Sequence, residues 1–343
     1  MPTPTSASAR CNHAFSPTTP IALQSPLLGQ EGSQKVFPMT MLLLEQGLNG
    51  LQFGLMLFLL AAGLTLVLGI MDMVNLAHGS LYMVGAYFAA TAAQATGSFW
   101  IALPLALAAT AGIGMALEMG LLRKLYERDH LSQVLATFAL ILIANDLVRM
   151  IWGPQALMLD APRALAGTVE VIPGAPYPAF RLFIIGVGLV VAVALYWMIV
   201  HTRVGALVRA GASNREMALA LGVNVKRLFT LVFGLGAALC ALAGAMLGPL
   251  LAVQIGMGES ILIQAFVVVV IGGIGSIRGA LIGALLVGMV DTIGRAFLPA
   301  LLRSFLSNNI ADALGPTLAA MAVYILMAAV LYWKPTGLFS ARG

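Results

Sequence analysis

Three polar or glycine-rich segments interrupt an otherwise apolar sequence, and they contain the residue types that could do chemistry. One surrounds His78, one is a basic stretch around Glu216, and one is a glycine cluster around Ser276. The sequence has no phosphate-binding loop of the form Gly-x-x-x-x-Gly-Lys-Ser/Thr, no His/Cys cluster with metal-ligand spacing and no evident Ser/His/Asp set. We therefore predict no catalytic residue, no metal site and no cofactor, and any ATP that drives this protein must be bound by another chain.

The elements that must position these segments are membrane-spanning helices. Of the 343 residues, 60% are hydrophobic and only 9% are charged, whereas an ordinary soluble domain has about 25% charged residues. This composition excludes a soluble enzyme, a nucleic-acid-binding protein and a disordered chain. The apolar stretches are continuous and do not alternate with polar residues, which indicates helices and not the strands of a barrel.

Nine apolar runs are candidate spans, most of them close to the roughly 20 residues that cross about 30 Å of hydrocarbon. The run 261–274 is shorter and leads into the glycine cluster, so we expect a broken or re-entrant element there. The fold class predicted is all-α, a polytopic transmembrane bundle of about eight to nine spans. The runs are 48–71, 76–95, 99–122, 131–152, 182–200, 228–252, 261–274, 280–298 and 317–333.

Residues 1–40 are predicted to form a disordered or non-conforming extension ahead of a transmembrane domain at 41–343. The extension is rich in Pro, Ser and Thr and lacks the basic start and apolar centre of a good secretory signal. Basic residues gather in the connections 123–128 and 203–227, which predicts that both face the cytoplasm. Parity then places the connection 153–181 and the N-terminal extension outside.

The basic connection between the fifth and sixth runs is expected to contain a short helix at 212–221. Ser213 or Asn214 can cap its start, Glu216 lies in its first turn, and Gly222 can end it. A short amphipathic helix between two spans suggests a knob that docks into a groove of a partner. The alternative is a loop that only carries the charges that set topology.

The other two segments are candidates for the transport pathway. Asn75 can cap the helix that follows it, which would leave His78 in the first turn as part of a hinge lining the pathway, the alternative being a simple turn near the membrane surface. Glycines around Ser276 can unwind a helix and expose a half-helix N-terminus that suits a carboxylate. Arg278 should lie at the inner face, so a tight turn or an inner gate comes first and substrate contact second.

Four motifs resemble those of the branched-chain amino-acid permease subunits of bacterial ABC importers, and they occur in the same order as in that family. Residues 216–222 are similar to the Glu-Ala-Ala…Gly loop of such permeases, and residues 75–79 resemble Asn-x-Ala-His-Gly. Residues 272–280 resemble a Gly-Gly-x-Gly-Ser-x-x-Gly run, and residues 334–339 a Pro-x-Gly-Leu-Phe ending. Ser80 and Arg278 depart from the pattern, which bears on the subclass of substrate.

The resemblance implies a multi-pass permease subunit of the bacterial inner membrane that is not itself an enzyme. Its expected partners are a paralogous permease or a second copy, two cytoplasmic ABC ATPase subunits, an extracytoplasmic substrate-binding protein and the lipid bilayer, but no nucleic acid. The residues implied in ATPase coupling are Arg209, Arg215, Glu216, Ala218, Leu221 and Gly222. Those implied in the translocation pathway or gate are Asn75, His78, Gly79, Gly272, Gly273, Gly275, Ser276 and Gly279.

The expected cargo is a branched-chain amino acid or a related small solute, and two alternatives remain open. The same architecture could carry urea, short amides or aromatic and other carboxylates. An independent secondary transporter would instead need an unpaired coupling carboxylate deep in the bundle. The charges within the runs have local explanations: Asp146 with Arg149 and Asp291 with Arg295 are spaced to pair on one helix face, and Glu118 can reach the interface.

Overall fold

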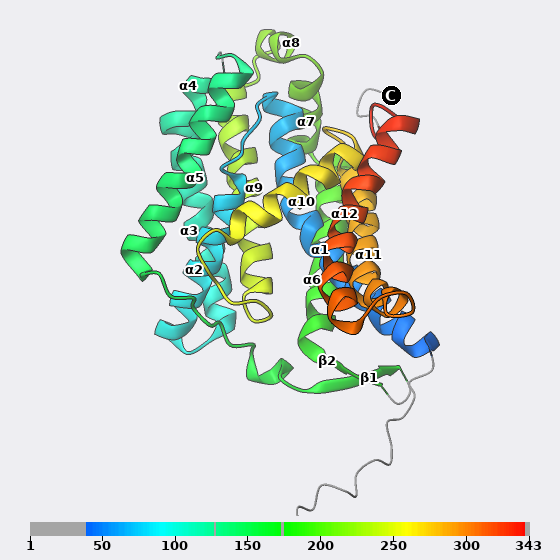
Figure 1. Ribbon diagram of the computed structural model, residues 1–343. Helices are drawn as coiled ribbons and strands as arrows, with labels where there is room; N and C mark the ends of the chain where they lie inside the picture. The colour runs from blue at the N-terminus through cyan, green and yellow to red at the C-terminus, as the bar shows by residue number, and fades with distance from the viewer. Residues whose placement is uncertain (1–38, 127, 173–174, 340–343) are drawn as a thin grey trace, which may run out of the picture. The chain divides into compact units, whose positions relative to one another are not determined.

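The computed structural model describes residues 39–339 except 127, 173 and 174 (Figure 1). The predicted extension at 1–40 lies outside the described residues, apart from 39 and 40, which begin the first helix. In the described part, seven helices are long and apolar enough to cross a membrane, which confirms the predicted helical bundle. They are α1 (Met39–Met71), α3 (Phe99–Leu117), α5 (His130–Trp152), α6 (Ala179–His201), α9 (Val225–Leu247), α11 (Ile277–Leu302) and α12 (Asn308–Trp333).

Two further helices lie within the bundle. Together with the seven spans, they bring the number of bundle helices in the described residues to nine, within the predicted range of eight to nine. α2 (His78–Thr96) is less apolar than the spans, and α10 (Met257–Gly272) has only 16 residues. Because α10 falls short of a full crossing, it is the broken element that the short run predicted. The span begun by α3 continues through a π-helical turn (Glu118–Leu122) into α4 (Arg123–Leu125).

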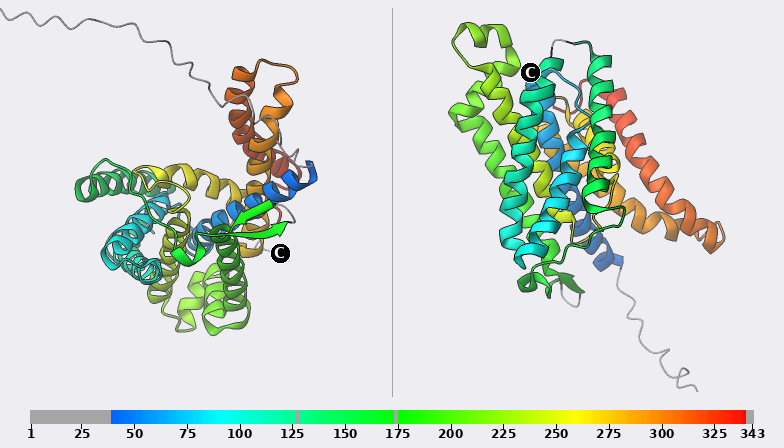
Figure 2. Two further views of the ribbon diagram at one scale, coloured as in Figure 1. Left: turned by 90° about the horizontal axis from the view of Figure 1, so that it is seen from below. Right: turned by 90° about the vertical axis from the view of Figure 1, so that its left-hand side faces the viewer.

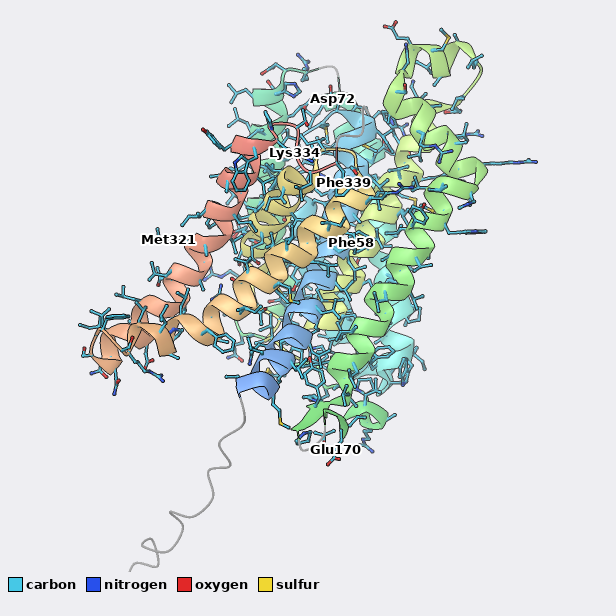
Figure 3. All side chains as sticks on the ribbon, turned by 90° about the vertical axis from the view of Figure 1, so that its right-hand side faces the viewer. Phe58, Asp72, Glu170, Met321, Lys334 and Phe339 are labelled. Carbon is cyan, nitrogen blue, oxygen red and sulfur yellow. The ribbon has the colours of Figure 1, made fainter. Side chains whose placement is uncertain are left out.

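The connections gather at two opposite ends of the bundle (Figure 1). α4, α7 (Arg203–Ser213) and α8 (Arg215–Ala220) lie at one end. The antiparallel strands β1 (Thr168–Ile172) and β2 (Ala175–Pro178) lie at the other. This grouping is the one that the basic connections predict. Figure 3 places Asp72 and Lys334 at the α8 end and Glu170 at the opposite end.

α1 and α9 are the most buried spans and form the centre of the bundle, where α2, α3, α6, α10 and α11 pack against one or both of them. α12 packs on α11 at the periphery (Figure 2). Glycines let helix backbones approach closely: a Cβ on Gly54 of α1 would lie 2.8 Å from the carbonyl oxygen of Ala284 in α11. On α9, a Cβ on Gly234 would lie 2.8 Å from the side chain of Met115 in α3. Close approach of this kind is the main packing device between helices in lipid. These glycines therefore mark contacts between helices.

The strand pair is fastened to the start of α1 through Asn49. Its side-chain oxygen accepts hydrogen bonds from the Tyr177 hydroxyl at 2.9 Å and from Arg181 at 2.6 Å. Burial raises the pKa of Tyr177, so the phenol stays neutral and keeps donating this bond. The connection 153–181 is thus held against the bundle at that end.

Candidate functional site

α8 is a six-residue helix with defined caps at both ends. The Asn214 side chain accepts a hydrogen bond from the backbone N–H of Met217 at 2.9 Å, so Asn214 is the cap and Ser213 ends α7. Leu221 is the C-cap, and Gly222, the next residue, has a φ of +81°. The N–H of Val223 bonds the carbonyl of Ala218 at 3.0 Å. A left-handed glycine with such a bond is a common way to end a helix. The predicted helix at 212–221 is therefore two helices, α7 and α8.

Met217 of α8 and the C-cap residue Leu221, four residues apart, form an apolar face that nothing in the described chain covers. Met217, Leu219 and Leu221 are 57%, 51% and 77% exposed, whereas Ala218 between them is buried. Glu216 lies in the first turn and is exposed. Ala218 therefore seats the helix, and its neighbours form the surface that a partner can reach. For Arg215, only its place at the start of α8 is described.

The segment around His78 returns into the bundle after α1 ends. His78, the first residue of α2, packs between two glycines: a Cβ on Gly63 of α1 would lie 2.7 Å from the imidazole Nε2, and one on Gly236 of α9 would lie 3.1 Å from Cε1. Gly63 is eight residues before the end of α1, or about 12 Å along the helix axis. Residues 72–77 therefore turn back by about that depth, and α2 begins inside the bundle.

Asn75 does not cap α2, contrary to the prediction. Its side-chain oxygen accepts a hydrogen bond from the N–H of Ala77 at 3.0 Å, which closes a turn one step before the helix. Asn75 and His78 are fully buried, and the Asn75 amide nitrogen and both His78 ring nitrogens have no hydrogen-bond partner among the described residues. Unsatisfied groups of this kind are costly in a membrane interior. The segment is thus a buried polar site, and its role in the pathway stays a prediction.

The starts of the two short helices meet. A Cβ on Gly79 of α2 would lie 2.9 Å from the Leu262 Cβ and closer still to the Gly258 carbonyl in the first turn of α10. Gly256, just before α10, has a φ of +83°. Helices that begin inside a bundle leave first-turn N–H groups without intrahelical partners. Gly79 therefore marks the point where the starts of α2 and α10 cross. The sequence predicted only a hinge at this position.

The glycine cluster forms the tight turn from α10 to α11. Gly273 and Gly275 have φ values of +98° and +82°, which L side chains rarely adopt. Ser276 caps α11, its hydroxyl oxygen accepting a hydrogen bond from the N–H of Gly279 at 3.1 Å. Gly272 and Gly279 lie backbone to backbone, so that a Cβ on either would overlap the other. The turn lies at the α8 end, as the turn or inner-gate hypothesis requires (Figure 3).

The C-terminal segment docks onto this turn, a contact that the sequence did not predict. The N–H of Leu338 bonds the Ile271 carbonyl at 2.8 Å, and the N–H of Phe339 bonds the Gly272 carbonyl at 3.0 Å. These carbonyls belong to the last turn of α10, where intrahelical donors are missing. Two of the four recognised motifs are therefore parts of one local structure.

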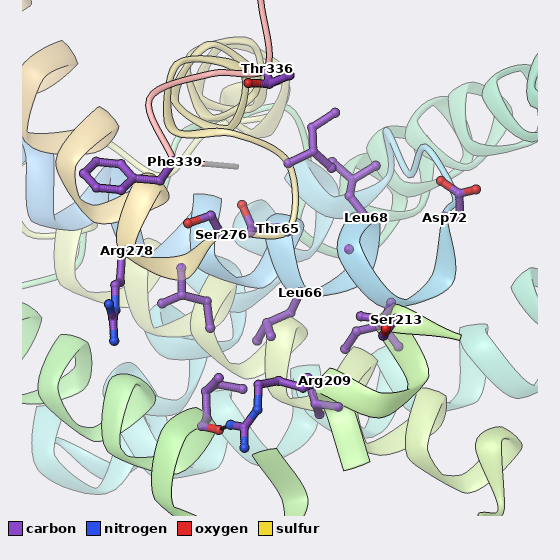
Figure 4. Close-up of a pocket in the computed structure, with 18 of the residues that line it drawn as sticks. Thr65, Leu66, Leu68, Asp72, Arg209, Ser213, Ser276, Arg278, Thr336 and Phe339 are labelled. Atoms are coloured by element: carbon purple, nitrogen blue, oxygen red, sulfur yellow. Dashed lines mark hydrogen bonds between the residues drawn. The ribbon is translucent and has the colours of Figure 1, made fainter. Parts of the chain in front are cut away.

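One cavity is lined by residues of both α7 and the glycine turn. It has a volume of about 1120 Å³ and is lined by parts of α1, α6, α7, the α10–α11 turn and the C-terminal segment (Figure 4). Of the predicted site residues, Arg209, Gly275 and Ser276 line it, whereas Asn75, His78, Glu216 and Gly222 do not. One predicted coupling residue and two predicted gate residues thus meet in this cavity, and the buried histidine is separate.

Glu118 does not reach the interface, contrary to expectation. It is fully buried and accepts hydrogen bonds from Arg123 at 2.9 Å, Tyr126 at 2.9 Å and Thr230 at 2.6 Å. The last of these ties α3 to α9. Arg123 also donates through its Nε at 3.2 Å, so the carboxylate accepts four hydrogen bonds, which makes its burial tolerable. The signal in the sequence was the spacing of Glu118 and Arg123, which are five residues apart. In the structure this spacing corresponds to the π-helical turn between them.

The two predicted ion pairs have different outcomes. Asp291 and Arg295 pair at 2.8 Å, as their spacing predicts. Asp146 and Arg149 form no ion pair in the described residues, so that prediction was wrong. Asn145, beside Asp146, donates a hydrogen bond to Glu259 at 2.5 Å and so links α5 to the first turn of α10.

Comparison with known proteins decides the family. The model of the branched-chain amino acid transport system / permease component family matches residues 47–332. The chain belongs to this family. It is similar to the high-affinity branched-chain amino acid transport system permease protein BraD of Pseudomonas aeruginosa, with 29% identity over 86% of this chain and 95% of the relative. The permease is therefore a multi-pass protein of the bacterial inner membrane, as expected.

Further relatives carry the same description. The permease is 30% identical to the branched-chain amino acid permease protein LivH of Salmonella typhimurium, over 74% of this chain and 87% of the relative. It is 27% identical to the probable branched-chain amino acid transport permease protein LivH of Methanocaldococcus jannaschii, over 69% and 76%. No solved structure matches the chain.

Proposed function

We propose that this permease is the membrane-spanning subunit of an ABC importer for branched-chain amino acids or closely related small solutes. Two ATPase subunits bind at the α8 end, a binding protein delivers the solute at the end that carries β1 and β2, and a paralogous permease or second copy completes the pathway. The observation that carries the proposal is the uncovered apolar face of α8, on a chain whose family consists of permease components.

An independent secondary transporter has less support. Such a protein needs an unpaired carboxylate that takes up a coupling ion. The buried acidic side chains in the described part of the bundle are Glu118 and Asp291, and each is bound to an arginine. The permease relatives named above are described as branched-chain amino acid permeases and not as carriers of urea or amides.

Reconstitution tests the proposal. Liposomes that contain the permease, its companion permease, the ATPases and the binding protein should accumulate leucine only when ATP is present. Gradient-driven uptake by the permease alone, without ATPase or binding protein, would overturn the proposal. A thermal-shift screen of the binding protein with leucine, urea, acetamide and benzoate separates the proposed cargo from its alternatives.

A co-purification experiment tests the role of α8 directly. Leu221→Ser and Met217→Ser remove apolar surface from the exposed face and should lower the amount of ATPase retained by the tagged permease. Leu131→Ser is the matched control, because Leu131 is 67% exposed at the start of α5 and does not belong to α8. Equal retention in all three variants would argue against docking through α8.

A further inference from the structure

The cavity between α1, α6 and the α10–α11 turn contains an unneutralised pair of arginines. Arg278 donates a hydrogen bond to the Tyr196 hydroxyl at 2.8 Å, and its guanidinium lies 5.0 Å from the centre of that ring. Arg209 donates to the backbone carbonyl of Ile199. Tyr196 and Ile199 are three residues apart on α6, so they are neighbours on one helix face. Both arginines are therefore anchored on the last two turns of α6 and line the same cavity.

No carboxylate in the described part of the chain pairs with either arginine. Asp72 also lines the cavity, but Figure 4 shows it across the cavity from Arg278. An anion bound in the cavity would be attracted by both positive charges. Both side chains are exposed to solvent, so an anion from solution can reach them.

Two hydroxyl groups in the lining of the cavity can supply hydrogen bonds. Thr65 of α1 lines the cavity, is 1% exposed, and its hydroxyl has no hydrogen-bond partner. Ser276 uses its oxygen as an acceptor for the Gly279 N–H, so its own O–H remains free to donate into the cavity. Ser276 also begins α11, whose first N–H groups favour a negative charge. Figure 4 shows Thr65 and Ser276 next to each other.

The rest of the lining is mostly aliphatic. Leu66, Ile70, Val208 and Val270 all face the cavity, which is large enough for a small amino acid. A cavity with two guanidinium groups, two hydroxyls and an aliphatic wall suits a carboxylate on a branched aliphatic body better than it suits a highly charged phosphate.

We propose that this cavity binds the carboxylate of a small aliphatic amino acid or 2-oxo acid at the α8 end of the permease. The proposal rests on the function proposed above, which places this end in the cytoplasm. Arg209 belongs to α7, which leads into α8, while Thr65 and Ser276 belong to α1 and α11. A bound carboxylate therefore links α7 to the core helices, and accumulated solute restrains the element that contacts the ATPases.

Equilibrium binding to the purified full chain tests the proposal. In nanodiscs of neutral phosphatidylcholine, L-leucine and 4-methylpentanoate should bind, and leucinol, which lacks the carboxylate, should bind at least about tenfold more weakly. Arg278→Gln and Thr65→Val should each weaken leucine binding by about tenfold. Arg203→Gln is the matched control, since Arg203 is exposed on α7 but does not line the cavity.

Four results would overturn the proposal. These are equal binding of leucine and leucinol, equal effects of Arg278→Gln and Arg203→Gln, inorganic phosphate binding as tightly as leucine, and loss of leucine binding when anionic phosphatidylglycerol enters the nanodisc. The last would assign the arginines to a lipid headgroup. ATP-driven uptake by the complete importer without leucine binding to the chain refutes this site alone, whereas binding without such uptake refutes the importer function.

Discussion

Gly337 of the C-terminal segment lies against Gly273 of the α10–α11 turn. A Cβ on Gly337 would come 2.6 Å from both the backbone N and the Cα of Gly273, and both glycines have positive φ angles. The contact requires glycine at both positions, because a Cβ on Gly337 would meet the backbone of Gly273 and a Cβ on Gly273 would meet the backbone of Phe339 and Thr336. The end of the chain and the glycine turn are therefore one structural unit.

We expect Gly337→Ala to release the C-terminal segment from this turn. The substitution introduces both an overlap and a strained backbone, which together cost about 1–3 kcal/mol. The melting temperature of the detergent-solubilised permease should fall. Gly167→Ala is the control, because nothing lies within 4 Å of a Cβ there and its φ is ordinary. A variant as stable as this control would mean that the docking contributes nothing.

A second prediction concerns the niche of His78. Gly63→Ala brings a Cβ within 2.7 Å of the imidazole and 3.0 Å of the Gly236 backbone, so α1 and α9 must separate. Overpacking of this kind costs about 1–3 kcal/mol. Gly186→Ala on α6, where a Cβ meets nothing, should be harmless. Thermal unfolding monitored by tryptophan fluorescence compares the two, and similar midpoints would contradict this packing.

The core of the fold followed from the sequence, but its two broken helices did so only in part. Short length and nearby glycines indicated that α10 is broken. α2 looked like an ordinary span, because residues 76–95 form a run of near-normal length. The re-entry of residues 72–77 depends on a long-range fit of His78 between Gly63 and Gly236. Hydrophobic periodicity carries no information about such a fit.

A third prediction separates a buried ion pair from an exposed one. Arg123→Met leaves Glu118 buried without its cation and should lower stability clearly. Arg303→Met breaks a pair whose two side chains are 50% and 51% exposed, and such pairs contribute about 0–1 kcal/mol. Unfolding midpoints measured side by side test this. A larger loss in the Arg303 variant would reverse our ranking of the two pairs.

A fourth prediction addresses transport. Glu216→Lys reverses a charge beside the exposed face of α8, and Gly222→Arg strains a left-handed residue. Both should uncouple ATP hydrolysis from uptake while the permease still inserts in the membrane. Glu170→Lys, at the opposite end, provides the charge-reversal control. Uptake assays and ATPase rates in proteoliposomes are the measurements. Normal uptake in both α8 variants would discredit coupling through this helix.

The residues of the candidate site were predictable one motif at a time, whereas their grouping was not. Arg209, Gly275 and Ser276 were singled out in separate segments, and the structure brings them to one cavity. Thr65 and Tyr196 gave no signal, because a threonine and a tyrosine in apolar runs look like packing residues. Their importance depends on which helices are neighbours, and that is set by glycine contacts between α1, α10 and α11.

The central position of α1 and α9 has a consequence for biogenesis. The two helices bury most of their surface, yet more than 150 residues separate their starts. When α1 leaves the ribosome and enters the bilayer, lipid must cover the face that α9 later occupies, and His78 lacks one wall of its niche. The early part of the chain is therefore unfinished until α9 is synthesised, and a protein truncated before residue 225 should be degraded.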